Sequence, residues 1–461
     1  MAERFDVVVV GARCAGSPLA ALLARRGLRV AVVEKAKFPH DTLSTHFFQA
    51  QALASLERLG VTEKLQATGA PCVGLVNLRI EDLQFQAPLP QQPGDVGGLR
   101  SVRRLVLDPI LAGAAAEAGA ETRMGATVTG LVKDGARVTG VRVKQDGAES
   151  TLQARLVVGA DGRNSTVANS AGARKYNVVW NQRFAYWSFF EGAEAGPDPA
   201  FVLHRWGERF VIASPSDSGL YQVVVMPELS ELPRYRGDLE GSYIEHVHSC
   251  QPVAEALSGA RRVGKMFGML RWQGFFRDAS GAGWVLLGDA GHFKDPAAGQ
   301  GIGDAFRQGE KLVPAIVRGL EGSDRVLDEA LVEWGRWRND DAIGHYWLAT
   351  DIGSGGNAPT ALPEVGKRLL ARGELAPLIN LFSHRGKPSQ VLTPPRLAAA
   401  MGRVFARPGC DRRALLGEIR GLVALNARRQ RQYRWPVYEE ADGTANALTT
   451  KPNPDSDAAA Q

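Results

Sequence analysis

The sequence predicts an α/β protein in which a mixed sheet is combined with an inserted antiparallel sheet and a helical C-terminal region. Three observations support this class. The first is a β-branched run near the N-terminus that is followed by a glycine turn and a helix-forming stretch. The second is a pair of later strands that end in acidic turns, and the third is a central segment of short apolar strands separated by Gly, Pro and Ser. The 461 residues are 44% hydrophobic and 23% charged, which is typical of a folded globular chain.

The first predicted element is a βαβ unit. Residues 7–10 form a β-branched run suited to a strand that is buried on both faces of a parallel sheet. Residues 17–26 have the composition of a helix, which should end at Gly27, and residues 28–33 form a second apolar strand closed by Glu34. This unit predicts a Rossmann-like nucleotide-binding domain.

The turn of this unit is similar to the dinucleotide-binding fingerprint G-x-G-x-x-G. Gly11 permits the sharp turn, Gly16 lets helix and strand pack closely, and the helix start offers free N–H groups to a pyrophosphate. Glu34 follows about 20 positions later, where a carboxylate can accept hydrogen bonds from ribose hydroxyls. Arg13 replaces the middle glycine, so either the phosphate lies farther out or the guanidinium contacts it. A triphosphatase loop is excluded, because Ser-Pro follows Gly16 where Lys and Ser/Thr are required.

Two later strands end in acidic turns. Residues 156–159 lead into Asp161 and Gly162, and the polar residues that follow can cap a helix. Residues 284–287 lead into Asp289, then into a glycine-rich loop and a helix. With the N-terminal fingerprint, in this order and spacing, these motifs resemble the p-hydroxybenzoate hydroxylase class of FAD-dependent monooxygenases, called group A. The resemblance covers roughly residues 5–350.

The resemblance implies a tightly bound, non-covalent FAD. It assigns the ribityl chain to Asp289, the isoalloxazine edge to the turn 296–302, the FAD phosphates to Arg104, and the adenine to the backbone of Val128. The whole set of implied cofactor residues is Gly11, Ala12, Arg13, Cys14, Ala15, Gly16, Glu34, Lys35, Thr45, Arg104, Val128, Asp161, Gly162, Arg163, Asp289, Pro296, Gly299, Gly301 and Ile302.

Two further assignments follow from the same resemblance. Asp161 and Gly162, with Arg163 as a cationic partner, are associated in the family with the pyrophosphates of both FAD and NAD(P)H. His46 lies in the loop after the ribose-binding acid, which relatives place close to the flavin, so it is the candidate catalytic residue. A structural role for a single loop histidine is the alternative reading.

In this family, reduced nicotinamide delivers hydride to FAD, O2 adds at the flavin C4a position, and the hydroperoxide transfers oxygen to an organic substrate, expected here to be aromatic. With a single dinucleotide fingerprint in the sequence, NAD(P)H should bind transiently. The tryptophan-halogenase signature W-x-W-x-I-P is absent from the sequence. Other halogenases, a geranylgeranyl reductase-like enzyme and a non-catalytic flavin-binding regulator remain alternatives, and the oligomeric state is left open.

We expect four regions along the chain. A discontinuous FAD-binding domain takes residues 1–75, 101–175 and 277–350, and a substrate domain takes 76–100 and 176–276; a helical region at 351–450 and a disordered tail at 451–461 complete the chain. The substrate domain is rich in aromatics, most of them expected in its core and some able to stack on a planar substrate. They are Tyr186, Trp187, Phe189, Phe190, Trp206, Tyr221, Phe267 and Trp272.

Composition excludes several other classes of protein. The formal net charge of +6 is modest for this length, so nucleic-acid binding is not implied. The four cysteines lie far apart without zinc-type spacing, so we expect neither a metal site nor a disulfide framework. No apolar run reaches the ~18 residues of a membrane span. The N-terminus does not resemble a signal peptide, and we expect a cytoplasmic protein.

Overall fold

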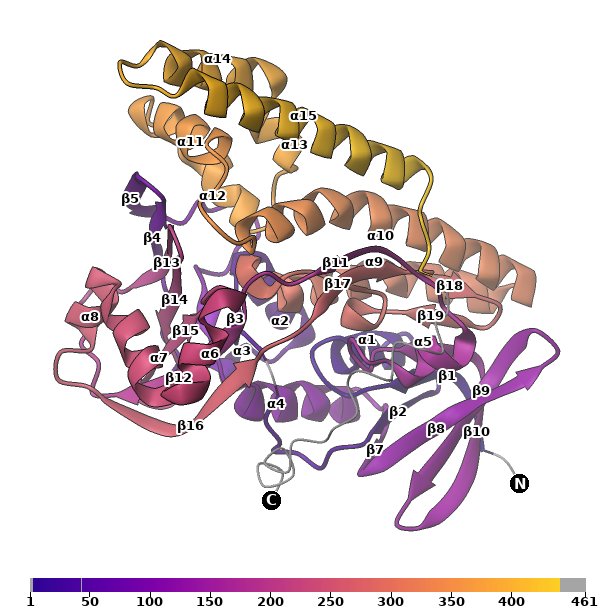
Figure 1. Cartoon of the computed structure of the whole chain (residues 1–461). Coiled ribbons are helices and arrows are strands. Elements are labelled where there is room, and N and C mark those ends of the chain that lie inside the picture. Colours follow the sequence, from indigo (N-terminus) through magenta and orange to yellow (C-terminus); the bar gives the residue numbers. More distant parts are fainter. Residues whose placement is uncertain (1–2, 43, 440–461) are drawn as a thin grey trace.

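The computed structural model describes residues 3–42 and 44–439, so the tail expected at 451–461 lies outside the described residues. Within these residues the chain forms two large sheets, two small sheets and a C-terminal group of helices (Figure 1). The α/β class, with a mixed sheet, a second inserted sheet and C-terminal helices, is confirmed. No helix in the described part is both long and apolar enough to cross a bilayer.

The first large sheet is mixed, as predicted. Its strands are β1 (Glu3–Val10), β2 (Val30–Glu34), β7 (Glu121–Met124), β8 (Ala126–Asp134), β9 (Arg137–Gln145), β10 (Ala148–Gly159), β18 (Ser280–Gly281) and β19 (Trp284–Leu286). β1 pairs in parallel with β2 and β10, and β10 pairs in parallel with β19. β9 runs antiparallel to both β10 and β8. The carboxyl ends of the parallel strands therefore meet at one edge, where ligands bind in sheets of this kind.

Both faces of β1 are covered, which explains its unbroken apolar run. Val7 and Val9 pack with the helices α1 (Gly16–Ala24), α4 (Arg104–Glu117), α9 (Gly301–Glu321) and α10 (Asp324–Ile352). Val8 and Val10 point the opposite way and join a second core with β8, β9 and α5 (Thr166–Ala171). The strand predicted at 28–33 is observed at Val30–Glu34, because the chain first turns through Gly27 in the left-handed region at φ 81°.

The second large sheet has the order β16-β12-β15-β14-β13-β4-β5. Its strands are β4 (Leu75–Ile80), β5 (Leu83–Pro88), β12 (Ala185–Glu191), β13 (Ala200–Trp206), β14 (Arg209–Pro215), β15 (Leu220–Val225) and β16 (Arg261–Met269). All neighbours are antiparallel except β13 and β4, which pair in parallel. The prediction of a purely antiparallel sheet is wrong for this pair, because β4 arrives from a distant segment of the chain rather than through a hairpin.

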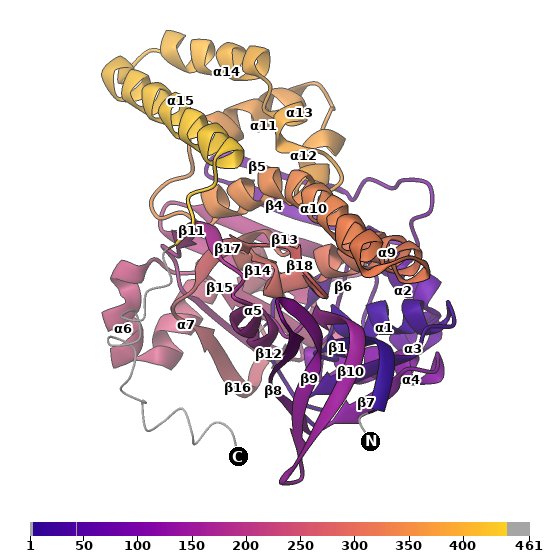
Figure 2. The same cartoon turned by 90° about the vertical axis from the view of Figure 1, so that its right-hand side faces the viewer.

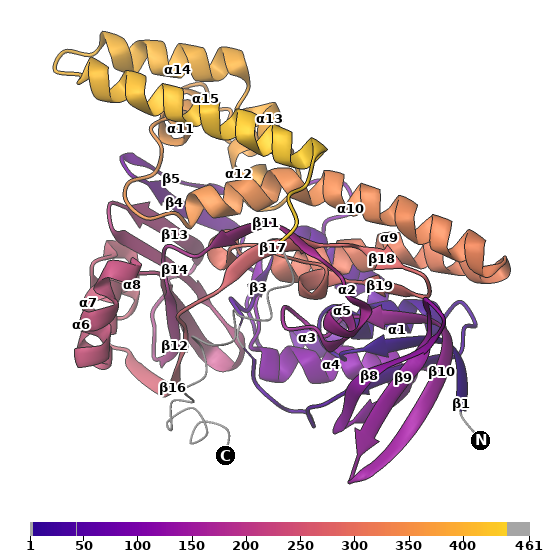
Figure 3. The same cartoon turned by 45° about the vertical axis from the view of Figure 1, so that its right-hand side comes forward.

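Helices cover both faces of this sheet. On one face lie α6 (Leu232–Gly237), α7 (Leu239–His248) and α8 (Gln251–Ala256), visible beside β12 in Figure 3. The other face shares a core with the C-terminal helices. These are α11 (Ala361–Ala371), α12 (Ala376–Phe382), α13 (Pro388–Val391), α14 (Pro394–Ala406) and α15 (Arg412–Arg434). Figure 2 shows α14 and α15 at the end of the molecule remote from the first sheet. The helix α10 lies between this pair of helices and that sheet.

The remaining elements connect the two large sheets. A three-stranded sheet contains β11 (Lys175–Trp180), β17 (Gln273–Arg277) and β20 (His292–Phe293), and β3 (Phe47–Phe48) pairs with β6 (Arg100–Ser101). The helices α2 (Ala50–Leu59) and α3 (Thr62–Gln66) follow β3. The short 3-10 helices η3 (Gly288–Ala290) and η4 (Pro296–Ala298) flank β20 and precede α9.

Candidate functional site

A cavity of about 510 Å³ lies where the two large sheets meet. Its walls come from the ends of β1, β2 and β10, from β12 and β15 of the second sheet, and from the segment between η3 and α9. Many residues that the sequence assigns to a cofactor line it. They are Gly11, Arg13, Cys14, Ala15, Glu34, Lys35, Thr45, Arg104, Val128, Asp161, Gly162, Asp289, Pro296, Gly299, Gly301 and Ile302.

The remaining predicted residues, Ala12, Gly16, Arg163 and His46, do not line the cavity. Ala12 and Gly16 are buried behind its wall in the turn between β1 and α1. The structure thus brings three separated stretches of the chain together around one space. That the lining residues contact FAD stays a prediction.

The turn between β1 and α1 has room only for glycine at two positions. Gly11 has φ 102°, and a Cβ on it would lie 2.5 Å from the backbone oxygen of Ala160. A Cβ on Gly16 would lie 1.8 Å from the backbone oxygen of Gly11. The close contact of helix and strand depends on these two glycines, and no side chain caps the start of α1. The residues of the turn just before α1, Arg13 to Ala15, line the cavity.

Glu34 ends β2 with its carboxylate held in place. Oε2 accepts a hydrogen bond from the N–H of Ala12 (2.9 Å), and Oε1 accepts one from the N–H of Ala36 (3.0 Å). Each oxygen retains a further lone pair, and the residue lines the cavity. The carboxylate therefore both fixes the glycine turn and stays available to hydroxyl donors of a ligand.

Arg13, at the place of the missing fingerprint glycine, is paired with a buried carboxylate. Its Nη1 lies 2.7 Å from Oδ2 of Asp108, and Arg104 contacts the other oxygen of the same carboxylate at 2.8 Å. Cys14 donates its thiol to Asp108 (3.6 Å), and burial raises the pKa of Cys14 to about 12, so it stays protonated. Two guanidinium groups sharing one carboxylate leave this wall of the cavity net positive, which favours a diphosphate.

The turn after β10 is held by Asp161. Its carboxylate accepts hydrogen bonds from the hydroxyl of Ser165 (2.5 Å) and the N–H of Thr166 (2.7 Å), so it caps α5. Burial raises the pKa of Asp161. Arg163 instead lies with Nη1 2.7 Å from the sulfur of Met269 and its guanidinium over the ring of Phe293. Asp161 and Gly162 line the cavity, and Arg163 packs against two other lining residues, Met269 and Phe293.

Asp289 lies in η3 and projects into the cavity. Burial raises its pKa to about 6, against the opposing effect of the positive charges of Arg104 and Arg163. Gly288, before it, has φ 60°, a turn that sends the carboxylate toward the ligand space. The Asp289 side chain is exposed to the cavity space, so the hydroxyl groups of a ribityl chain can reach its carboxylate and stabilise the ionised form by donating to it.

The loop from β20 to α9 gives the cavity a second helix start. Asp295 caps η4 by accepting from the N–H of Ala297 (3.0 Å) and accepts from the indole of Trp272 (3.1 Å). Gly299 has φ 61°, and a Cβ there would lie 2.1 Å from the ring of Phe47. No side chain caps α9 at its first residue, Gly301, which lines the cavity, so its N–H groups suit a ligand with partial or full negative charge.

His46 is buried behind the cavity rather than in it. Its Nδ1 accepts from the N–H of Arg104 (3.1 Å), and its ring packs edge-on against Phe189. Burial lowers its pKa to about 3, so the ring is neutral. In this position His46 fixes the start of α4 and hence the Arg104 guanidinium, which favours the structural reading of the residue over a catalytic one.

The wall toward the second sheet is apolar. Its residues are Ala185, Trp187, Val224, Met226, Met269 and Phe293. Of the aromatics expected in the substrate domain, only Trp187 is among the residues that line the cavity, and most of the others are buried in the sheet core. This wall suits an apolar or planar ligand.

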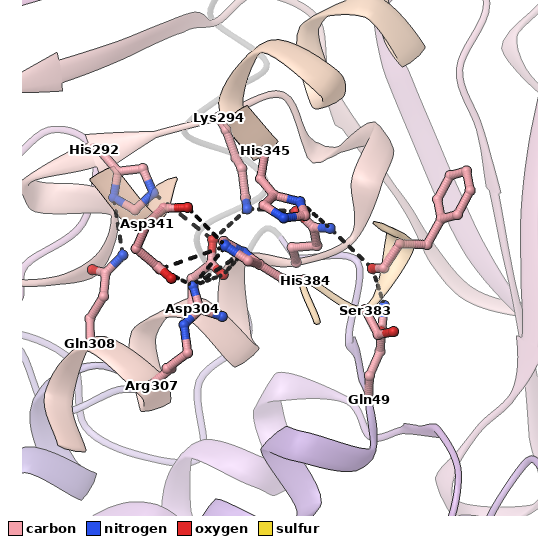
Figure 4. Close-up of polar contacts among 12 residues, drawn as sticks. Gln49, His292, Lys294, Asp304, Arg307, Gln308, Asp341, His345, Ser383 and His384 are labelled. Carbon is pink, nitrogen blue, oxygen red and sulfur yellow. Dashed lines mark hydrogen bonds and ion pairs between the residues drawn. The ribbon is translucent and has the colours of Figure 1, made fainter. Parts of the chain in front are cut away.

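Sequence reasoning missed a cluster of polar residues beside the loop between β20 and α9. Lys294, Gln300 and Asp304 line the cavity, and Lys294 contacts both Gln300 and Asp304. Gln300 in turn contacts His345 of α10, and Asp304 contacts His384 in the connection between α12 and α13; Figure 4 shows these two histidines beside Lys294 and Asp304. Lys294 and Asp304 lie within a motif that the sequence singles out, but the two histidines carry no local pattern. In the described residues, no group of three or more His, Cys, Asp or Glu side chains could hold a metal ion.

The donor set of the cavity fits FAD. The turn before α1, the uncapped start of α9 and the Arg13–Asp108–Arg104 group provide for phosphates and a negatively charged ring edge. Glu34 and Asp289 provide acceptors for sugar and ribityl hydroxyls. The glycines at which a Cβ would collide leave backbone bare at the same surface. Nothing in the lining conflicts with that cofactor.

Comparison with known proteins agrees with this fit. The family model described as FAD binding domain matches residues 4–235. The menaquinone reductase of Mycolicibacterium smegmatis is 27% identical over 353 residues, covering 69% of this chain and 78% of that protein. The 6-methylpretetramide 4-monooxygenase of Streptomyces rimosus is 26% identical over 349 residues, covering 70% and 78%. The structure of the flavin-dependent brominase Bmp2 superimposes with a TM-score of 0.71 at 21% identity, covering 87% of this chain and 98% of that one.

Proposed function

The chain belongs to the FAD binding domain family, and from that membership we propose that it is an FAD-dependent monooxygenase. It would use NAD(P)H and O2 to hydroxylate a small organic substrate of aromatic character. The observation that carries the proposal is the make-up of the single cavity: polar and cationic along the first sheet, apolar along the second. The first part suits the cofactor, and the second suits a planar substrate held next to it.

In this proposal the residues of the chain bind, orient and exclude water. Glu34 and Asp289 hold the sugar and ribityl hydroxyls, Arg13 and Arg104 face the phosphates, and the start of α9 faces the flavin edge. When bound, FAD supplies the redox chemistry, accepting hydride from NAD(P)H and activating O2. The site therefore needs no nucleophile or metal from the protein, and the apolar wall around Trp187 keeps water away from the reacting atoms.

The nicotinamide cofactor is proposed as a transient co-substrate. The chain has one fingerprint turn, and that turn is part of the cavity assigned to FAD. Asp161 and Gly162 remain the proposed contact for NAD(P)H, with Arg163, which packs on the cavity-lining residues Met269 and Phe293, as the cationic partner.

A flavin-dependent reductase or halogenase is the second candidate. The reductase is favoured by the similarity to a menaquinone reductase, and the halogenase by the fold of the brominase. An apolar wall that accepts an aromatic ring also accepts an isoprenoid chain, so the wall by itself favours neither substrate.

Substrate-dependent consumption of O2 and NAD(P)H by the FAD-loaded protein tests the proposal. The protein is incubated with a panel of phenols and heteroaromatic acids, with prenylated quinones, and with each substrate plus bromide. A product heavier by one oxygen, formed with O2 uptake, is the expected result. Saturation of a C=C bond without O2 uptake would replace the proposal with a reductase, and a brominated product formed only with bromide would replace it with a halogenase.

A further inference from the structure

A buried cluster of titratable side chains links the cavity to the surface beside the C-terminal region (Figure 4). Lys294 and Asp304 line the cavity, and their side chains are 5% and 3% exposed. His384, in the connection between α12 and α13, is 5% exposed, whereas Asp341 on α10 is 24% exposed. Three of the four groups are therefore buried, and Asp341 is the one that solvent reaches.

The distances between successive groups are short. Nζ of Lys294 lies 2.5 Å from Oδ2 of Asp304, and Nδ1 of His384 lies 2.8 Å from Oδ1 of Asp304. On the other side of the imidazole ring, Nε2 lies 3.1 Å from the backbone oxygen of Asp341 and 3.6 Å from its carboxylate. One ring thus stands between two carboxylates, one facing each nitrogen.

The charges of the cluster balance when its histidines are neutral. Asp304 and Asp341 supply two negative charges, and Lys294 and Arg307 supply two positive ones, with Arg307 2.5 Å from Asp341. Burial would raise the pKa of Asp304, but its cationic neighbours and a hydrogen bond from His384 hold that pKa well below the usual range. Burial also lowers the pKa of His384. The shorter contact, 2.8 Å from Nδ1 to the Asp304 carboxylate, favours the proton of the neutral ring on Nδ1, while Nη2 of Arg307 lies at 3.1 Å from Nε2 and 3.2 Å from Nδ1.

The other two histidines near the cluster are held by different partners. His345 stacks on His384 with ring centres 3.6 Å apart, and its nitrogens face the backbone oxygen of Gly386 (3.1 Å) and the amide of Gln300 (3.4 Å). His292 contacts the amide of Gln308 and lies 3.9 Å from Asp304. Neither stands between the cavity and the surface, so both serve as walls of the cluster.

The backbone at His384 gives an independent sign that this side chain is needed where it is. Its φ is 55°, in the left-handed region that is unfavourable for residues other than glycine. The strained turn presents the imidazole to Asp304 and Asp341. Among the described residues of the connection between α12 and α13, His384 is the one that forms a hydrogen bond or ion pair with Asp304 or Asp341. Strain of this kind persists where surrounding contacts fix a side chain in a particular place.

We propose that Asp341, His384 and Asp304 carry protons between the solvent and Lys294 in the cavity. A proton from solvent reaches Nε2 of His384 by way of the Asp341 carboxylate, while the Nδ1 proton passes to Asp304. From Asp304 it replaces the proton that the Lys294 ammonium gives to a bound ligand. One proton enters from solvent, one is given to the ligand, and no electrons move. This transfer leaves the ring protonated on Nε2, and the reverse transfer restores the starting form: a proton passes from the ligand by way of Lys294 and Asp304 to Nδ1, and the Nε2 proton is released to Asp341. The inference rests on the proposed function, because a redox reaction shielded from water by the bound cofactor and substrate needs a route for its protons.

The arrangement at His384 can be tested without any cofactor. Histidine labelled with 15N in the cofactor-free protein reports which ring nitrogen carries the proton, and His384→Gln identifies the signal. The expected result is a neutral ring protonated on Nδ1. A ring protonated on Nε2 would overturn the proposal, because its Nδ1 lone pair would then face the Asp304 carboxylate and could pass no proton to it.

Proton transfer itself is measured on the FAD-loaded, reduced protein as it reacts with O2, with a pH-sensitive dye in a stopped-flow instrument. Asp341→Asn should slow proton exchange by about 10-fold or somewhat more. This effect is smaller than the ~10²-fold or larger loss expected when a general acid itself is removed. Added imidazole should restore the rate. His384→Gln, which keeps a donor to Asp304 but cannot relay a proton, should behave in the same way.

The matched control is Glu333→Gln, which also replaces a carboxylate of α10 with an amide. Glu333 pairs with Arg318 on the surface, away from the cluster. This variant should exchange protons at the wild-type rate. Wild-type rates in both Asp341→Asn and His384→Gln would overturn the proton route. If the protein binds no FAD at all, the proposed function fails, while the histidine measurement still decides whether the cluster has the proton arrangement described.

Discussion

Replacing Gly16 with alanine should separate α1 from β1 and with it disturb the turn assigned to the phosphates. The added Cβ would lie 1.8 Å from the backbone oxygen of Gly11 and 3.0 Å from Cγ1 of Val9. The oxygen belongs to a turn that Gly11 already needs in a left-handed conformation, so it cannot rotate away. Overpacking of this kind costs about 1–3 kcal/mol, and a collision with backbone places Gly16→Ala at the upper end, about 3 kcal/mol.

A second glycine in a helix provides the control. Gly113 lies in α4, and a Cβ on it would meet nothing within 4 Å. Gly113→Ala should therefore stabilise the protein by about 0.5–1 kcal/mol, through the better helix propensity of alanine. The two substitutions are chemically identical and should change stability in opposite directions.

Urea unfolding followed by tryptophan fluorescence measures both variants, and flavin absorbance after reconstitution measures their FAD content. We expect a lower midpoint and little retained FAD for Gly16→Ala, and a slightly higher midpoint with full FAD content for Gly113→Ala. A Gly16→Ala protein as stable as the wild type, with unchanged FAD affinity, would refute the packing of helix on strand as the reason for this glycine.

The other expectations concern the carboxylates around the cavity. Asp289→Ala should purify largely without FAD, and Glu34→Ala should bind FAD more weakly, both seen in the ratio of flavin to protein absorbance. Because the pKa of Asp289 is raised to about 6 and hydroxyl donors favour its ionised form, the FAD dissociation constant should rise below pH 6, by roughly tenfold per pH unit. A flat profile between pH 8 and pH 5 would contradict this role. Asp108→Asn should lower the free energy of unfolding by about 3 kcal/mol in urea, because it leaves the buried Arg104 without its carboxylate.

The fold and one side of the cavity followed from local patterns in the sequence. The β1–α1 turn and the acidic turns after β10 and β19 combine a strand, a glycine and a carboxylate within a few residues, so each could be found before the structure was known. The partner of Arg13 could not, because Asp108 lies on a helix far along the chain and only tertiary packing brings the two together.

The C-terminal contribution could not be predicted either. His345 and His384 are single polar residues whose place depends on how α10 and the connection after α12 pack against α9. The sequence pattern predicts a helix at residues 326–337, whereas the observed helix α10 extends from Asp324 to Ile352, for a related reason. The continuation of the predicted helix is rich in charged residues that look solvated in sequence, but Arg338 is buried and Asp341 pairs with Arg307, so the helix runs on to Ile352.

Reconstitution with FAD tests the central claim most directly. The purified protein is incubated with excess FAD, unbound cofactor is removed by gel filtration, and bound flavin is measured against protein for the wild type and for Asp289→Ala. The account predicts about one FAD per wild-type chain and much less for the variant. A wild-type protein that stays colourless, or a variant that retains the cofactor in full, would contradict it.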